Sequence, residues 1–379
     1  MSTMKNLTYI TMVAAAALVL ASCEDKNRVD VKKDAAALPF TLPASMKLET
    51  IVANDFVKHR NYAAQAMKRQ GLTCTVKFTY PTEYSDIDVL RTLQRKFLAY
   101  GLSEEAAAAL PDHFTAPAEA SDVKPTLWQR LFGKKAAAPT IATTNSLLSD
   151  WIKEYIRGLL AEWNKEFQAI NSKDNPVESW LRERHADVLF ANDALLQLRV
   201  WHLDNTGAEQ GSTTVSVHLF DLATAKEFSQ ADIFNADSAE KIRDLVIPGL
   251  LEYWNVVREL VTDTKATWER TASLQELQTI LKDYKKHKTA KAPRTREIPL
   301  PELDAEGNVP FNKDAVWTPS TSFAIAPEGI VVLYSEGELG SRTLGSPEIT
   351  IPFAAILPHL REGTPVHDLA KTRGVVISH

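Results

Sequence analysis

The chain has 379 residues, of which 45% are hydrophobic and 24% charged, the balance of an ordinary globular protein of one large or two medium domains. Its formal net charge of −5 provides no global field that attracts nucleic acid, so we expect no nucleic-acid partner. With only two cysteines, Cys23 and Cys74, a disulfide framework is excluded.

The first 22 residues have the pattern of a lipoprotein signal peptide. An apolar stretch from Leu7 to Leu20 follows Lys5 and is too short to span a bilayer. It ends in Leu20-Ala21-Ser22-Cys23, which resembles the lipobox of bacterial lipoproteins. We therefore expect cleavage before Cys23 and acyl chains on its sulfur, including palmitate, that anchor the chain in a membrane. A plain secretory peptide with a chance cysteine is the alternative.

Residues 23–45 are polar and Ala-rich, which is typical of a flexible tether. The acidic pair Glu24-Asp25 resembles the surface-export signal of lipoproteins from Bacteroidota, although an ordinary solvated linker is the favoured interpretation. We expect the protein in the cell envelope, at the outer membrane, with its body either periplasmic or exposed at the surface.

The body begins with alternating apolar residues that predict strands over 47–54 and 72–80, the second stopped by Pro81. A helix is predicted over 86–100, and a short helix after Ser103. A long amphipathic helix is expected from an N-cap at Asn145 to about residue 170, where Asn175-Pro176 follows. Cys74 lies in a strand pattern and is interpreted as a core residue.

From Asp187 onward the apolar period changes to two. Strands over 194–204 and 213–222 predict a hairpin, followed by helices over 238–261, with a kink expected at Pro248-Gly249, and 264–288. Strands are expected again over 323–326, 329–334 and 348–351, with a short helix over 352–360.

Two stretches are similar to a known family. Residues 220–234, FDLATAKEFSQADIF, and residues 323–353, which begin FAIAPEGIVVLY and end in ITIPF, match its segments in order and spacing. They resemble the RsiV-like C-terminal extracytoplasmic domain, found in an anti-sigma factor that senses lysozyme and in Gram-negative lipoproteins. The likeness covers residues 179–379, and a weaker one at Cys74 to Pro81 extends to the module that often precedes this domain.

The resemblance implies an α+β fold with an antiparallel sheet and packed amphipathic helices, in two modules over residues 46–178 and 179–379. It implies no enzyme, because the domain has no established chemistry. The family often carries a Gly-Gly-Ala-His loop before the second hairpin strand. Here residues 205–211 read NTGAEQG, without the histidine, which puts the family's binding role for this loop in doubt.

The sequence contains no recognisable catalytic or metal-binding constellation. No two histidines have the i, i+4 spacing of a helical zinc site, and no G-x-S-x-G elbow occurs. His202 and His218 lie in neighbouring predicted strands and could approach each other, although separate solvated or satisfied histidines are the favoured interpretation. We therefore expect no cofactor, no metal and no catalytic site.

The favoured hypothesis is a binding or sensing module for lysozyme or peptidoglycan. Its candidate ligand-binding residues lie in two loops and are Asn205, Glu209, Glu336, Glu338 and Arg342. A structural or assembly lipoprotein that holds another envelope protein is the alternative, and an aromatic stripe exposed on a long helix would favour it. An envelope hydrolase is the third and least favoured reading.

Overall fold

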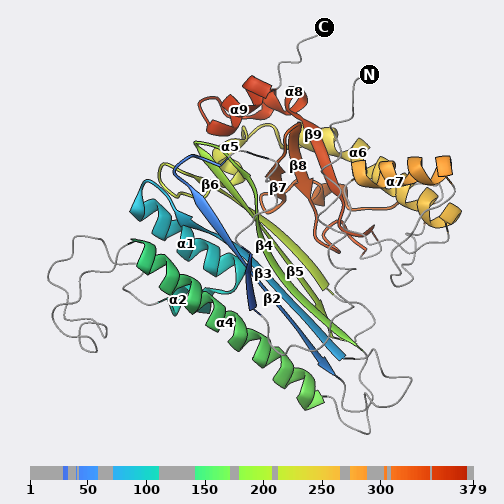
Figure 1. Cartoon of the computed structure of the whole chain (residues 1–379). Coiled ribbons are helices and arrows are strands. Elements are labelled where there is room, and N and C mark those ends of the chain that lie inside the picture. Colours follow the sequence, from blue (N-terminus) through green and yellow to red (C-terminus); the bar gives the residue numbers. More distant parts are fainter. Residues whose placement is uncertain are drawn as a thin grey trace, which may run out of the picture.

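The computed structural model describes residues 29–32, 40, 42–58, 71–110, 141–170, 179–206, 212–264, 274–287, 303–304, 309–341 and 344–373. The predicted signal peptide, Cys23, and the two candidate residues Glu209 and Arg342 lie outside them. Two sheets organise the described residues, one with six strands and one with three (Figure 1). None of the helices in these ranges is long and apolar enough to cross a bilayer.

The larger sheet is formed by β1 (Val29–Lys32), β2 (Lys47–Lys58), β3 (Gly71–Glu83), β4 (Trp180–Ala191), β5 (Leu195–Asn205) and β6 (Ser212–Asp221), in this order. Neighbouring strands are antiparallel except β3 and β4, which are parallel. Parallel strands need a crossover connection, and α1 (Ile87–Gly101), α2 (Glu104–Ala108) and α4 (Ile141–Ile170) lie in it. The predicted α+β class is confirmed, with a sheet that is mixed at this one pair.

Helices α1 and α4 lie along one face of the larger sheet (Figure 1). Helix α1 begins where predicted, because the Asp86 carboxylate accepts the N–H groups of Asp88 and Val89 at 2.9 and 3.0 Å. Its apolar stripe is buried against β3, and α4 contributes a second buried stripe. The members of the α4 stripe are Leu148, Ile152, Ile156, Leu160, Trp163 and Phe167.

The smaller sheet consists of β7 (Ser322–Ile325), β8 (Gly329–Leu333) and β9 (Glu348–Pro352), all antiparallel. Helix α6 (Ala239–Thr264) packs on it and α7 (Leu274–His287) packs on α6. The shorter elements are α5 (Gln230–Ile233), η3 (Lys313–Ala315), α8 (Phe353–Ile356), η5 (Leu357–His359) and α9 (Pro365–Arg373). Together they surround a second hydrophobic core.

The two sheets meet at the face of β4–β6 that α1 and α4 do not cover. Val215 of β6 is buried against Ala324 of β7 and Leu333 of β8. The alternation of side chains along β6 therefore divides its residues between two environments. Odd-numbered residues face the smaller sheet, and even-numbered residues face the side of the helices.

The prediction that Pro81 stops β3 is wrong, since the strand continues to Glu83. Proline lacks an N–H, but β3 pairs with β4 only as far as Phe78, so no neighbour on that side requires a donor from Pro81. The Pro81 carbonyl accepts a hydrogen bond from the buried Gln94 side chain at 2.9 Å.

The two long helices also differ from the sequence expectation. Helix α4 begins at Ile141, one turn before the predicted cap Asn145, and no proline or glycine lies between Pro139 and Asn145. Helix α6 is assigned continuously through Pro248, which is followed by Gly249. A Cβ on Gly249 would lie 2.5 Å from Ile349 Cγ2, so this glycine permits close packing of α6 on β9.

The predicted module boundary at residue 179 falls between β3 and β4, two paired strands of one sheet. The division into modules stays a prediction. Within the predicted tether, Val29–Lys32 form β1, which pairs with β2 from Val29↔Ala53 to Lys32↔Thr50. Without β1 the long strand β2 would leave one row of backbone groups unpaired, which explains why this polar segment adds to the sheet.

Candidate functional site

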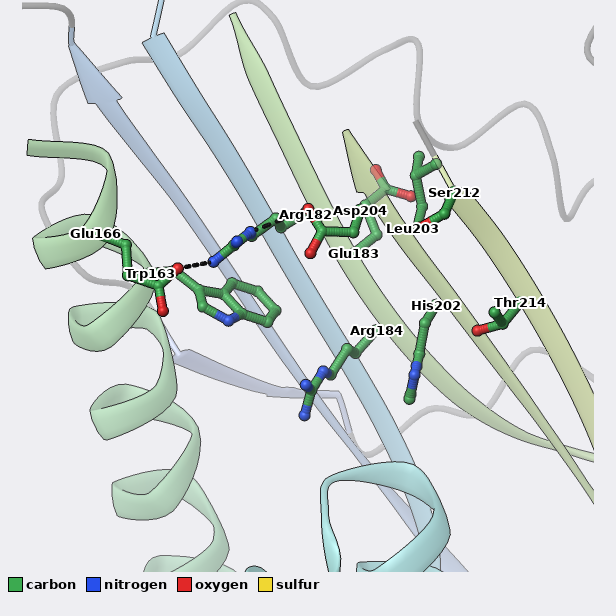
Figure 2. A pocket seen from close by; sticks show the side chains of 10 residues that line it. All are labelled: Trp163, Glu166, Arg182, Glu183, Arg184, His202, Leu203, Asp204, Ser212 and Thr214. Carbon is green, nitrogen blue, oxygen red and sulfur yellow. Dashed lines mark hydrogen bonds and ion pairs between the residues drawn. The ribbon is translucent and has the colours of Figure 1, made fainter. Parts of the chain in front are cut away.

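An open groove of about 370 Å³ lies between the C-terminal half of α4 and the strands β4, β5 and β6 (Figure 2). Ten residues line it: Trp163, Glu166, Arg182, Glu183, Arg184, His202, Leu203, Asp204, Ser212 and Thr214. It adjoins a shallower hollow that shares Glu166 and Arg182 and includes the exposed Ile170. A concave volume of this size suits a small ligand.

Strand register explains which polar side chains meet in the groove. Arg182 lies opposite Asp204, and Asp204 opposite Ser212, in one row across the three strands. The second row, two residues further along each strand, is Arg184, His202 and Thr214. Because side chains two residues apart share a face, both rows project toward α4.

Arg182 is held by partners on every side and fixes α4 to the sheet. Its guanidinium lies 5.8 Å from the Trp163 ring and 5.3 Å from the Trp180 ring. It donates hydrogen bonds to Glu166 of α4 at 2.5 Å and to Asp204 of β5 at 3.2 Å (Figure 2). Its side chain is only 14% exposed, so these bonds occupy a guanidinium that water barely reaches.

Arg184 has a different environment. It donates one hydrogen bond to the Leu102 carbonyl between α1 and α2, and its guanidinium lies 5.6 Å from the Trp163 ring. No ion pair joins Arg184 to a carboxylate among the described residues. Burial, with a further contribution from Arg182, lowers the pKa of Arg184. The groove therefore contains a partly buried positive charge with donors left for a ligand.

His202 lies beside Arg184 and points into the same space (Figure 2). Burial, with the charges of Arg184 and His185 adding to it, lowers the pKa of His202 to about 4, so the imidazole is neutral near pH 7. Its Nε2 atom is buried without a hydrogen-bond partner in the described part of the chain. Trp180 Nε1, deeper in the same region, shares this property.

The rim of the groove is acidic. Glu166 and Asp204 are 47% and 51% exposed, and each accepts one bond from Arg182. Both carboxylates retain acceptor capacity on the solvent side. The arrangement can hold an anionic group at Arg184 and His202 while hydroxyl or amide donors of the same ligand reach the rim.

The three described loop candidates, Asn205, Glu336 and Glu338, do not line this groove. Asn205 is the last residue of β5 and lies next to the lining residue Asp204. The Glu338 carboxylate accepts the Ser335 N–H at 2.8 Å, and burial raises the pKa of Glu338, so it stabilises its own turn. Glu336 is half-buried in that turn.

The β8–β9 loop reaches the larger sheet through one residue. The Ser335 hydroxyl lies 3.4 Å from both the Val215 N–H and the Val215 carbonyl on β6. The two predicted acids therefore lie near the edge of β6, while Asn205 lies at the end of β5.

The two histidines predicted as a possible pair do not approach each other. His202 lies opposite Thr214, whereas His218 lies opposite Leu198, four residues away along β5. The register of the hairpin separates them. His218 instead contacts Tyr100 and Glu227. Among the described residues no group of histidine, cysteine and acidic side chains could hold a metal ion.

Sequence reasoning missed the groove because its residues come from separate elements. Trp163 was assigned to a core stripe, which is correct, and the same side chain also forms the wall of the groove. The signal that could have indicated it is Arg182-Glu183-Arg184, which places two arginines on one face of a strand.

Residues 259–354 match the family described as "Protein of unknown function (DUF3298)". A DUF3298 domain therefore lies in the C-terminal part of the chain, and the second stretch of the resemblance, residues 323–353, falls inside it. The first stretch, residues 220–234, precedes it. No curated protein matches the chain.

Two solved structures of DUF3298 family members are similar to this chain. The protein from Bacteroides fragilis NCTC 9343 is 17% identical, with 86% of this chain and 98% of that chain covered and a TM-score of 0.47. The protein from Pseudomonas aeruginosa PAO1 is 12% identical, with 84% and 95% covered and a TM-score of 0.36. Both likenesses are too distant to assign a function to any residue.

Proposed function

We propose that this protein is a lipid-anchored binding module of the bacterial cell envelope, related to the RsiV-like domains and attached to the outer membrane through Cys23. Its groove between α4 and the larger sheet binds a small acidic ligand, and a peptidoglycan fragment is the ligand that fits best. The signal-peptide pattern supports the location, and the groove supports the ligand class.

One observation carries the ligand class: Arg184 lines an open groove, and among the described residues it forms no ion pair with a carboxylate. A partly buried guanidinium binds a carboxylate with charge-assisted hydrogen bonds, which are stronger than neutral ones. His202 Nε2 lies in the same row and offers a further polar atom to that ligand.

A peptidoglycan fragment has the complementary chemistry. Its lactyl and peptide carboxylates suit Arg184, while its sugar hydroxyls and amide N–H groups suit the exposed acceptors Glu166 and Asp204. The exposed residues Ser212 and Thr214 extend this polar lining along β6 with their hydroxyl groups.

The other two binding hypotheses have weaker support. Recognition of lysozyme would use the loop acids, and Glu338 is already bonded to the Ser335 N–H. An assembly role would be favoured by an exposed aromatic stripe, but Trp163 and Trp254 are buried and Trp151 is half-buried. The only large hydrophobic side chains exposed in the described ranges are Ile170 and Leu303.

The test is a calorimetric titration of the whole protein, purified in detergent, with an acidic muropeptide and with a neutral chitin oligosaccharide. We expect saturable binding of the muropeptide only. The R184Q variant should weaken it about tenfold or more, because a charge-assisted bond contributes roughly 1.5–3 kcal/mol. R157Q, which removes an exposed arginine of α4 paired with Glu154, is the matched control and should bind normally.

A muropeptide that gives no heat, or that binds R184Q as tightly as the unchanged protein, would disprove the groove proposal. Lysozyme is titrated in parallel. Binding of lysozyme that survives R184Q would assign recognition to the loops instead.

A further inference from the structure

A second polar cluster lies on the same face of β6, beyond the end of the groove. Thr214, which lines the groove, is followed at alternate positions by Ser216 and His218, all facing the helices. The Ser216 Oγ atom lies 3.1 Å from His218 Nε2, and His218 Nδ1 lies 2.8 Å from a carboxylate oxygen of Glu227. A hydroxyl, an imidazole and a carboxylate are thus joined in sequence.

Three separate elements position this chain of hydrogen bonds. Ser216 and His218 come from β6, and Glu227 comes from the turn after it, where a bridge between Phe220 and Glu227 returns the chain to the strand. Tyr100 comes from the end of α1. Its ring stacks on His218 with centroids 3.7 Å apart and planes inclined by 8°, and its hydroxyl donates to Glu227 at 2.6 Å.

The direction of the hydrogen bonds follows from the charge of Glu227. Burial opposes its ionisation, but the hydrogen bonds from His218 and Tyr100 outweigh burial and hold the pKa of Glu227 below its usual value. An ionised Glu227 accepts a hydrogen bond from the N–H at His218 Nδ1, so Nε2 carries the lone pair. Ser216 then donates its hydroxyl proton to Nε2, which is the bond that activates a serine nucleophile.

We propose that Ser216, His218 and Glu227 form a hydrolytic site for esters, in which Ser216 is the nucleophile and His218 the general base. Glu227 and Tyr100 are positioning residues that fix the tautomer and the plane of the imidazole. Local sequence patterns do not indicate this site, because Glu227 lies on a turn nine residues after His218. The chemistry at Ser216 does not depend on ligand binding in the groove, whereas the substrate class rests on the function proposed for the groove.

A donor for the oxyanion is available on the backbone. The Val215 N–H points to Ser335, and the Leu219 carbonyl accepts the Phe228 N–H, so odd residues of β6 direct their backbone groups away from β5. The same alternation turns the Val217 N–H toward this edge. Val217 directly follows the nucleophile, a position that supplies an oxyanion donor in other serine hydrolases.

The reaction balances without a cofactor. Ser216 Oγ attacks the ester carbonyl carbon, and its proton moves to His218 Nε2. The bond to the leaving alcohol then breaks, and the imidazolium gives that alcohol the proton. Water, deprotonated by His218, attacks the acyl-serine, which releases a carboxylic acid and restores Ser216.

The substrate class follows from what surrounds Ser216. One step along β6 is the polar groove, with Thr214, His202 and Arg184. An ester of a short acid carried on a polar glycan or peptide would place its body in the groove and its acyl group at Ser216. The His218 side chain is 15% exposed and the Glu227 side chain 30% exposed. The general base is therefore largely shielded from water, while the carboxylate that orients it is partly exposed.

The first test is covalent labelling of the whole protein, in detergent, with a fluorophosphonate, followed by intact mass and peptide mapping. We expect one adduct, on Ser216. The S216A variant should lose it, whereas S320A, which removes an exposed serine outside both the groove and the cluster, should keep it. H218Q should slow labelling by about 10²- to 10⁴-fold, the usual contribution of a general base.

Substitution of Glu227 separates catalysis from structure. Replacing Glu227 by glutamine removes the anion that orients the imidazole, so E227Q should label more slowly, whereas the conservative E227D, which keeps the anion, should restore part of the rate. S216A and H218Q are checked by thermal unfolding. The proposal is overturned if folded unchanged protein carries no adduct on Ser216, or if H218Q labels at the unchanged rate. Release of p-nitrophenol from its acetate, lost in S216A, would demonstrate turnover.

Discussion

The side chain of Gln197 and the backbone of Ile325 join the two sheets through a pair of hydrogen bonds. The Ile325 N–H donates to Gln197 Oε1 at 2.7 Å, and Gln197 Nε2 donates to the Ile325 carbonyl at 3.4 Å. Gln197 is completely buried on β5, and Ile325 ends β7. A side-chain amide thus completes the backbone bonding of a strand in the other sheet.

Replacing Gln197 by leucine should lower the free energy of unfolding by about 1–3 kcal/mol, because the Ile325 N–H and carbonyl would stay buried without partners. Urea unfolding measures this change. E162A, at an exposed position of α4, is the control and should stay within about 0.5 kcal/mol of the unchanged protein. An unaltered midpoint in Q197L would show that the link contributes nothing to stability.

Two glycines in helices should respond oppositely to alanine. A Cβ on Gly101 would lie 2.7 Å from Phe78 and 2.8 Å from Ala186, so G101A should lower the free energy of unfolding by about 1–3 kcal/mol. Gly158 is exposed on α4 with open space around its Cα, so G158A should raise it by about 0.5–1 kcal/mol. Equal effects of the two substitutions would contradict this account of α1 packing.

The sequence predicted the elements that local patterns specify. The β5–β6 hairpin, the strands β7–β9 and helix α1 lie where alternation, turn residues and helical periodicity placed them. The resemblance over residues 323–353 falls on the three strands of the smaller sheet and the start of α8. The prediction that β3 stops at Pro81 was wrong because local sequence does not show where β4 stops pairing with β3.

The candidate site was missed for a related reason. Arg184 and His202 are eighteen residues apart, and only the register of β4 with β5 makes them neighbours. The wall of the groove adds a further requirement, since Trp163 reaches it from the crossover helix α4. Long-range pairing of this kind leaves no periodic signal in a single sequence.

Acid should destabilise the fold partly through His202. Burial lowers its folded pKa to about 4, whereas the unfolded value is about 6.5, so the unfolded state binds the proton more tightly. The stability that the neutral His202 side chain contributes is complete above the unfolded pKa and is lost as the pH falls toward 4. Between about pH 7 and about pH 5, the unchanged protein should lose about 2 kcal/mol more stability than H202Q. Urea unfolding at both pH values tests this, and parallel losses would refute the assignment to His202.

Lipid attachment should depend on Cys23 alone. In cells given an alkyne analogue of palmitate, the unchanged protein should carry the label and enter the detergent phase on phase separation. C23S should lose the label, because the acyl chains are attached through the Cys23 sulfur.

Cys74 provides the matched control for this experiment. It is 1% exposed in β3, and burial, with the nearby Asp55 adding to it, raises the pKa of its thiol to about 12. A buried, protonated thiol does not react with an acyl donor, so C74S should keep the label and the membrane anchor. Label that persists in C23S and disappears in C74S would show that the lipid is attached to Cys74. Label that persists in both variants would show that the lipid is attached to neither cysteine.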